Sequence, residues 1–339
     1  MGNYSLQVTT YCVGNNDIFV LWLERLKILV YLWGNDCMLD FLQAEGVFAD
    51  LIQGIENFKT KYGNSECKER IPEAHYKFYG TDIWNQACAA LLCGQNILLV
   101  GQKATGKNLL AENLATAFQR PLWNISCHIN MDAETLIGSD TFKNGVVEFR
   151  PGPVCRSATE GGFCVIDEIN MAKNETLAVL HSLLDFRRII DVPGYGSVIM
   201  HGASRFIATM NYGYAGTREL NEALGSRFVV ITMPEISKEN ILRLLEEQFP
   251  RMGKNYRKEF AEVFTALQRK CSNAEISGRL LDLRGLLDAL RLMEKGISPL
   301  VALDMGITNK SFEEFERQLV RDVFRSRISE KLTAAEIFR

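Results

Sequence analysis

The eight residues 101–108, GQKATGKN, have the composition of a loop that binds phosphate groups. Glycines let backbone N–H groups turn inward around phosphate oxygens, and the N-terminus of a following helix adds its partial positive charge. A lysine at position 107 would reach the outer phosphates of a nucleoside triphosphate. The expected phosphate-binding residues are Gly101, Gln102, Lys103, Ala104, Thr105, Gly106, Lys107 and Asn108.

The last residue of this loop departs from the usual pattern. Such loops end in Gly-Lys followed by Ser or Thr, whose hydroxyl binds Mg²⁺. Asn108 stands there instead. Its side-chain oxygen is a hard, neutral ligand that suits Mg²⁺, but it is one atom further from the backbone than a hydroxyl and cannot ionise. Three alternatives remain open: a site with an altered metal ligand, a site that binds nucleotide but hydrolyses it poorly, or a plain strand-to-helix turn.

Two acidic residues follow an apolar run further along the chain. Residues 163–166, FCVI, lead directly into Asp167 and Glu168. At such a position an Asp holds Mg²⁺ through water, and a Glu acts as the general base that polarises the attacking water. The alternative is that both carboxylates only cap the next helix.

Two more polar residues stand beside apolar runs. Asn211 follows residues 205–210, where its amide would orient the attacking water or sense the terminal phosphate. Its alternative role is to favour a turn. Arg227 opens the last apolar run, and an arginine there would act as a finger on a neighbouring subunit's terminal phosphate. Alternatively, it only complements a helix dipole.

The elements that must position these residues are short apolar runs separated by helix-length amphipathic segments. Continuous apolar runs are typical of buried parallel strands, and their alternation with helices predicts a doubly wound α/β domain. Ligands of such sheets bind at the carboxyl ends of the strands, which is where most of the candidate residues lie. The runs are 96–100, 121–126, 163–167, 205–210 and 227–233.

The remaining chain is helical in pattern and gives three expected domains. Residues 1–70 are expected to form a helical N-terminal extension of unassigned role, with 59–70 as a linker. Residues 71–235 form the α/β domain, and residues 236–339 an α-helical domain. The apolar stretch 18–33 is too short and too charged at its centre to span a membrane comfortably, so a core or interface helix is expected.

Composition excludes several classes of function. The chain has 339 residues and a net charge of −3, so it has no general attraction to nucleic acid or anionic membranes. Its four histidines lack zinc-binding spacing, and no G-x-S-x-G motif is present. The nine cysteines form no C-x-x-C pair, which together with the lack of a secretory signal favours a cytoplasmic protein.

Taken together, residues from about 79 to 233 resemble an AAA+ ATPase, and more narrowly the MoxR group, which is related to dynein-related AAA modules and to the Rubisco- and nitric-oxide-reductase-activating ATPases. Residues 131–154 resemble an insert in the second helix of this clade, and 186–206 resemble a hairpin inserted before its sensor-1 strand. The motifs that carry the resemblance are GQKATGKN (101–108), FCVIDEIN (163–170), RFIATMN (205–211) and LGSRF (224–228).

The resemblance implies a five-stranded parallel sheet with two hairpin inserts, followed by a helical lid. It implies ATP and Mg²⁺ as cofactors, with Asn108 and Asp167 at the metal. Glu168 would be the base, Asn211 sensor 1 and Arg227 the finger. Sensor 2 should be an arginine near the start of a lid helix, for which Arg284 matches best and Arg279 competes. Adenine should rest near Tyr79 and Gly80.

The same resemblance implies a homo-oligomer, in the form of a hexameric ring, that acts as a chaperone or activator on a client protein. A von Willebrand factor A-domain protein is the expected partner. Two other functions stay open: a nucleotide-binding switch with weak hydrolysis, which Asn108 keeps in play, and a less favoured nucleic-acid motor.

Overall fold

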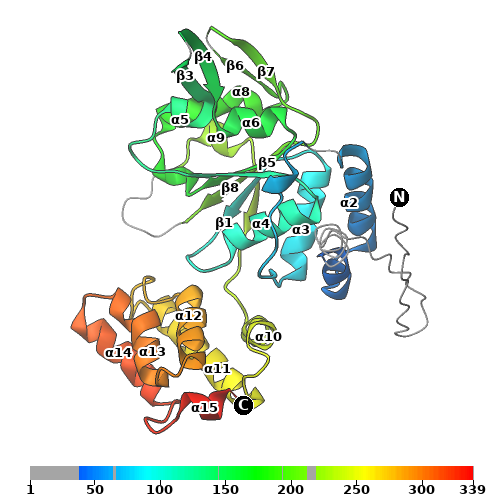
Figure 1. Cartoon of the computed structure of the whole chain (residues 1–339). Coiled ribbons are helices and arrows are strands. Elements are labelled where there is room, and N and C mark those ends of the chain that lie inside the picture. Colours follow the sequence, from blue (N-terminus) through cyan, green and yellow to red (C-terminus); the bar gives the residue numbers. More distant parts are fainter. Residues whose placement is uncertain (1–37, 64–65, 144, 193, 212–218, 339) are drawn as a thin grey trace, which may run out of the picture.

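The computed structural model describes residues 38–63, 66–143, 145–192, 194–211 and 219–338. The chain forms an α/β domain that carries two hairpins at its far end, and a separate helical domain (Figure 1). The apolar stretch 18–33 lies outside the described residues. Among the described helices, none is both long enough and apolar enough to cross a membrane.

The α/β domain is built on a five-stranded parallel sheet with the strand order β2-β5-β8-β1-β9. Each strand coincides with one of the predicted apolar runs, so the fold class is confirmed. The sheet places β5 and β1 on either side of β8, which brings the carboxyl ends of three motif-bearing strands together. The strands are β1 (Ile97–Val100), β2 (Leu122–Ser126), β5 (Phe163–Asp167), β8 (Arg205–Met210) and β9 (Val229–Thr232).

Helices cover both faces of this sheet, as continuous apolar strands require. Successive residues of β1 point to opposite faces: Ile97 and Leu99 lie in one apolar core, and Leu98 and Val100 in the other. The helices α3 (Thr81–Leu92) and α4 (Lys107–Ala117) contribute to the first core. The second core includes residues of α5 (Ala133–Ile137), α6 (Pro153–Thr159), α7 (Asn174–Leu177), α8 (His181–Leu184) and α9 (Glu222–Gly225).

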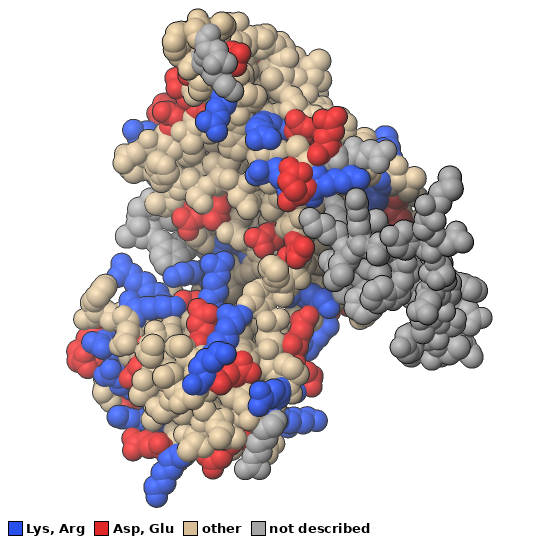
Figure 2. All heavy atoms as spheres, in the orientation of Figure 1, with Lys and Arg blue, Asp and Glu red and all other residues tan. Residues whose placement is uncertain are grey.

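Both predicted hairpins are present, as β3 (Gly138–Lys143) with β4 (Val146–Pro151) and β6 (Ile189–Val192) with β7 (Gly196–Ile199). The rings of Phe149 and Tyr195 stack with centroids 4.8 Å apart and join the two hairpins. Figure 2 shows this end of the molecule to be largely uncharged. Its exposed apolar side chains include Phe142, Val146, Val147 and Ile199.

The N-terminal segment is part of the α/β domain's core. Residues 38–44 are helical and are followed by α2 (Ala49–Tyr62). Leu42, Ile55 and Phe58 belong to the same apolar cluster as Ile97 of the sheet. The expected linker 59–70 begins later than predicted, because α2 continues to its end at Tyr62 and a short 3-10 turn, η1, covers Lys68–Arg70.

The C-terminal region forms a helical domain with its own apolar core. Two of its helices, α12 (Leu283–Glu294) and α13 (Pro299–Gly306), approach each other closely: a methyl group at Gly285 would lie 2.1 Å from the carbonyl oxygen of Gly306. Only glycine permits such backbone contact. The helices are α10 (Lys238–Gln248), α11 (Lys254–Ser272), α12 (Leu283–Glu294), α13 (Pro299–Gly306), α14 (Glu314–Arg325) and α15 (Ala334–Ile337).

Candidate nucleotide-binding site

The predicted phosphate-binding loop connects β1 to the N-terminus of α4. Gly106 adopts the left-handed backbone conformation (φ 82°), and a side chain there would also meet the ring of Phe78 at 3.1 Å. Glycine is therefore required by both the backbone and the available space. The helix that follows begins at Lys107, so its first N–H groups and the positive end of its dipole face the loop.

Lys107 is buried and folded back over its own loop. Its Nζ donates hydrogen bonds to the carbonyl oxygens of Gly101 at 3.0 Å and Gln102 at 2.6 Å. Burial lowers the pKa of Lys107 to about 8, although the nearby carboxylates of Asp167 and Glu168 oppose the shift. The ammonium thus lies beside the position that phosphate groups would occupy.

Asn108 and Asp167, the two expected metal ligands, contact each other. The Asn108 Nδ2 donates a hydrogen bond of 2.9 Å to Asp167 Oδ2. With its nitrogen directed at the carboxylate, the amide has its oxygen available as a metal ligand. Mg²⁺ keeps several waters and is usually held by one or two carboxylates together with substrate phosphates, and this donor pair fits that preference.

Thr209 organises both acidic residues and was not identified from the sequence. Its hydroxyl donates to Asp167 Oδ1 and accepts a 3.0 Å hydrogen bond from the backbone N–H of Glu168. Thr209 is fully buried in β8. A polar residue among the apolar residues FIATM (206–210) was the available signal, but Thr is common in strands and its hydroxyl had no predictable partner.

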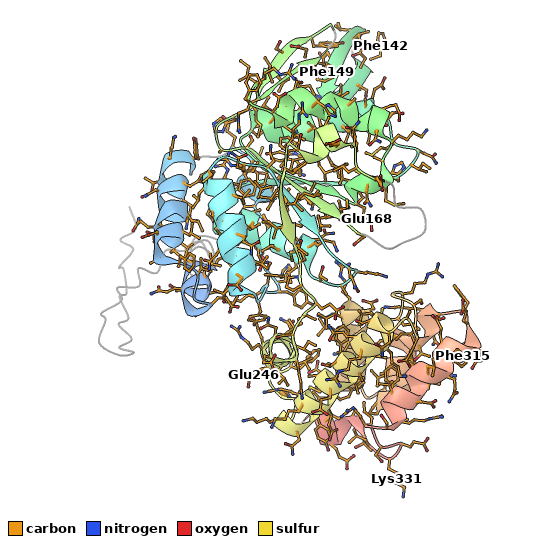
Figure 3. The ribbon with its side chains drawn as sticks, turned by 180° about the vertical axis from the view of Figure 1, so that it is seen from behind. Phe142, Phe149, Glu168, Glu246, Phe315 and Lys331 are labelled. Carbon is orange, nitrogen blue, oxygen red and sulfur yellow. The ribbon has the colours of Figure 1, made fainter. Side chains whose placement is uncertain are left out.

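Glu168 and Asn211 lie at the carboxyl ends of the neighbouring strands β5 and β8. The Asn211 Nδ2 donates a hydrogen bond of 2.9 Å to Glu168 Oε1. Glu168 itself has a left-handed backbone conformation (φ 53°), which is uncommon for residues other than glycine. Residues in such conformations cluster at functional sites. In Figure 3 Glu168 lies at the edge of the α/β domain nearest the helical domain.

Arg227 lies near the amino ends of the strands, at the opposite end of the sheet from the phosphate-binding loop. Val229, two residues later, pairs with Ile97 at the start of β1, whereas the phosphate-binding loop follows the end of that strand. The Arg227 Nε donates to the carbonyl oxygen of His181 at 2.9 Å, and an NH2 group lies 3.5 Å from an Asp185 oxygen. The structure therefore does not bring Arg227 to the phosphate-binding loop of its own chain.

The two candidate lid arginines differ in their surroundings. Arg284 is exposed in the first turn of α12, and its charge interacts with Glu112 of α4, the helix that follows the phosphate-binding loop. Arg279 interacts instead with Glu316 of α14, inside the helical domain. Of the two arginines, Arg284 is therefore the one that lies near the candidate site.

The expected base subsite at Tyr79 and Gly80 is already hydrogen-bonded. The carbonyl oxygen of Tyr79 accepts from the Nδ2 of Asn240 in α10 at 3.1 Å. The N–H of Gly80 donates to Glu45 Oε1 at 2.9 Å. The backbone groups that would meet the edge of a base are thus held by side chains of the helical domain and of the N-terminal segment.

Within the described ranges, no three His, Cys, Asp or Glu side chains cluster as a ready-made metal centre. A metal at this site would therefore depend on nucleotide oxygens as well as on Asn108 and Asp167. That dependence is usual for Mg²⁺ in nucleotide sites.

Comparison with known proteins identifies a family for this chain and two relatives that extend over most of its length. Residues 96–228 match the model of the AAA domain, dynein-related subfamily. The chain is 35% identical over 296 residues to the uncharacterized protein YojN of Bacillus subtilis (strain 168). This aligned region covers 86% of this chain and 97% of that protein. It is 35% identical over 253 residues to the uncharacterized protein SAUSA300_1302 of Staphylococcus aureus (strain USA300), covering 73% of this chain and 95% of that protein. The chain belongs to the AAA proteins of the dynein-related subfamily and carries an AAA-type ATPase domain.

Proposed function

We propose that this protein hydrolyses ATP as a MoxR-like AAA+ ATPase and uses the energy to remodel or mature a partner protein in the cytoplasm. The observation that carries the proposal is the convergence of Lys107, Asn108, Asp167, Glu168 and Asn211 at neighbouring strand ends. These residues supply a phosphate cradle, a metal-binding pair and a base held by an amide.

In this proposal each residue has a distinct task. Lys107 leaves the carbonyl groups of its loop and binds the outer phosphates. Asn108 and Asp167 would hold Mg²⁺, which would supply charge neutralisation at the phosphate oxygens. Glu168 accepts the proton of the attacking water, and Asn211 keeps the carboxylate aligned.

The position of Arg227 supports assembly into a ring. Arg227 lies near the amino ends of the strands, so the length of β1 separates it from the phosphate-binding loop of its own chain. In a closed head-to-tail ring, which we propose to be a hexamer, it would reach the site of the next subunit. Arg284 would contact the same nucleotide from the lid.

The two hairpins are the proposed contact with the client. They project from the end of the α/β domain that lies away from the helical domain, and their exposed side chains include the apolar Phe142, Val146, Val147 and Ile199 (Figure 1). That surface favours a protein client over a nucleic acid, whose phosphates would need lysines and arginines. The proposed co-partner is a von Willebrand factor A-domain protein.

A nucleotide-binding switch with weak hydrolysis is the second candidate. The observation that favours it is Asn108, which replaces a hydroxyl by a longer, neutral amide. ATP affinity and ATP turnover measured on the same preparation separate the two functions. Tight binding without turnover would support the switch, and turnover that Glu168→Gln abolishes would support the ATPase.

The chaperone role is tested by trapping the ATP-bound state. Glu168→Gln should retain ATP and hold its client, whereas the matched control Lys107→Ala/Glu168→Gln should bind neither. A protein that co-purifies with the first variant only when ATP is present supports the proposal. Recovery of the same proteins with both variants would contradict it.

A further inference from the structure

The segment that precedes the matched AAA domain meets the first lid helix beside the nucleotide-binding loop. Three parts of the chain come together there: the end of the N-terminal helical segment at Glu45, the stretch 77–80, and α10. In Figure 1, α10 lies between the α/β domain and the rest of the helical domain.

Glu45 is the centre of this junction. Its side chain is only 4% exposed, and its two oxygens bind different parts of the molecule. Oε1 accepts the hydrogen bond from the N–H of Gly80, and Oε2 pairs with an NH2 group of Arg243 in α10 at 2.5 Å. The backbone oxygen of Glu45 also accepts from the Thr81 hydroxyl at 2.7 Å. A buried carboxylate is costly unless such partners satisfy it.

Tyr79 completes the junction from the other side. The Arg243 guanidinium lies 4.2 Å from the centre of its ring, and the Tyr79 hydroxyl donates to Glu247 of α10 at 2.6 Å. Its ring also meets Phe41 edge-on, with centroids 5.6 Å apart. Tyr79 packs against the cores of both domains, so movement of α10 must displace it.

The junction is connected to the phosphate-binding loop through the residue before Tyr79. The Phe78 ring lies against Gly106, the last glycine of the loop, and the Phe78 N–H donates to Asn113 Oδ1 of α4 at 2.9 Å. A displacement of residues 78–80 therefore acts directly on the loop and its helix.

We propose that Glu45 is a positioning residue for ATP binding: it clamps α10 to residues 79–80 and thereby sets the lid arginine Arg284 against the phosphate-binding loop. The N-terminal segment then has a defined task, which is to fix the lid relative to the nucleotide. The ATP-dependent part of this inference rests on the proposed function, whereas the clamp itself does not.

The clamp is tested without nucleotide by hydrogen–deuterium exchange in α10. Glu45→Gln can still accept the hydrogen bond from the Gly80 N–H but loses its charge attraction to Arg243. Arg243→Gln removes the same ion pair, and because the Arg243 side chain is exposed, this substitution should not prevent folding. We expect α10 amides to exchange about tenfold faster in either variant, with no further increase in the double variant. The exposed Glu56, on α2, provides the matched control Glu56→Gln. Unchanged exchange in α10, or effects that add in the double variant, would overturn the clamp.

The positioning role is tested by the KM for ATP of the same variants. We expect Glu45→Gln and Arg243→Gln to raise KM about tenfold, while Glu56→Gln matches the wild type. Faster exchange in α10 without a change in KM would overturn the positioning role. If the wild type shows no turnover at all, the proposed function fails, and the exchange experiment still decides the clamp.

Discussion

The side-chain amide of Asn108 donates a hydrogen bond to the Asp167 carboxylate across 2.9 Å. In loops that end in Ser or Thr, one hydroxyl can both donate to a neighbouring carboxylate and bind the metal through its oxygen. Asn108 divides these two tasks between its nitrogen and its oxygen. The substitution is therefore compatible with a working metal site.

This division predicts how substitutions at position 108 behave. Asn108→Ala removes both atoms, so the Mg²⁺ concentration for half-maximal ATPase activity should rise about tenfold, which corresponds to one lost polar interaction. Asn108→Thr should stay close to the wild type because a hydroxyl performs both tasks. The measurement is ATPase rate against Mg²⁺ at fixed ATP. An Asn108→Ala variant with wild-type Mg²⁺ dependence would show that Asn108 is not a ligand.

Thr209 should be needed for turnover rather than for nucleotide affinity. Thr209→Val keeps the shape but removes the hydroxyl that joins Asp167 to the Glu168 backbone. We expect kcat to fall about tenfold to a hundredfold, since a buried partner of a charged group is lost. Thr209→Ser retains the hydroxyl and is the matched control. If Val and Ser behave alike in kcat measurements, the hydroxyl does not position the two acids.

The buried state of Lys107 predicts that nucleotide binding weakens at alkaline pH. Its pKa is lowered to about 8, so above that pH the nucleotide-free protein loses the ammonium that the phosphates require. Bound phosphates favour the charged form of Lys107, so ATP binding above pH 8 should be accompanied by the uptake of a proton by this side chain. The Kd for ATP should be about tenfold higher at pH 9 than at pH 7. Calorimetry in buffers of different ionisation enthalpy measures the proton uptake directly, and a pH-independent Kd would contradict this role of Lys107.

The distance of Arg227 from its own loop predicts complementation between inactive variants. Arg227→Ala and Glu168→Gln should each be inactive alone, but in mixed rings an intact Glu168 can face an intact Arg227 from the neighbour. An equal mixture should recover about a quarter of wild-type activity if subunits assemble at random. The control is a mixture of Lys107→Ala with Glu168→Gln, which leaves no complete site. Absence of recovery after mixing and reassembly would argue against a site shared between subunits.

The sequence predicted the sheet well because each buried strand is a short, continuous apolar run bounded by turn residues. It also predicted that Asp167, Glu168 and Asn211 converge with the phosphate-binding loop, since the carboxyl ends of parallel strands share one edge. What it could not predict were side-chain contacts between distant segments. Glu45 and Arg243 are separated by 198 positions, and neither stands in a motif.

The choice between Arg284 and Arg279 illustrates the same limit. Both arginines stand near the start of a lid helix, and the local pattern fits either of them. Only the folded arrangement separates them, because the charge of Arg284 interacts with Glu112 of α4 whereas that of Arg279 interacts with Glu316. The extent of α2 was missed for a related reason. Its last turn is polar in sequence, yet the Tyr62 ring packs against Phe58 and His201.

The ring stack between Phe149 and Tyr195 has a mechanical consequence. Two hairpins that are far apart in the sequence cannot swing independently without separating two aromatic faces, which costs about 0.5–1.5 kcal/mol beyond the loss of buried area. The stack therefore couples the movements of the two hairpins. The segment that leads into β6, at Asp185 and Arg187, is also the place where Arg227 is held. A displacement of either hairpin would therefore alter the surroundings of the same arginine.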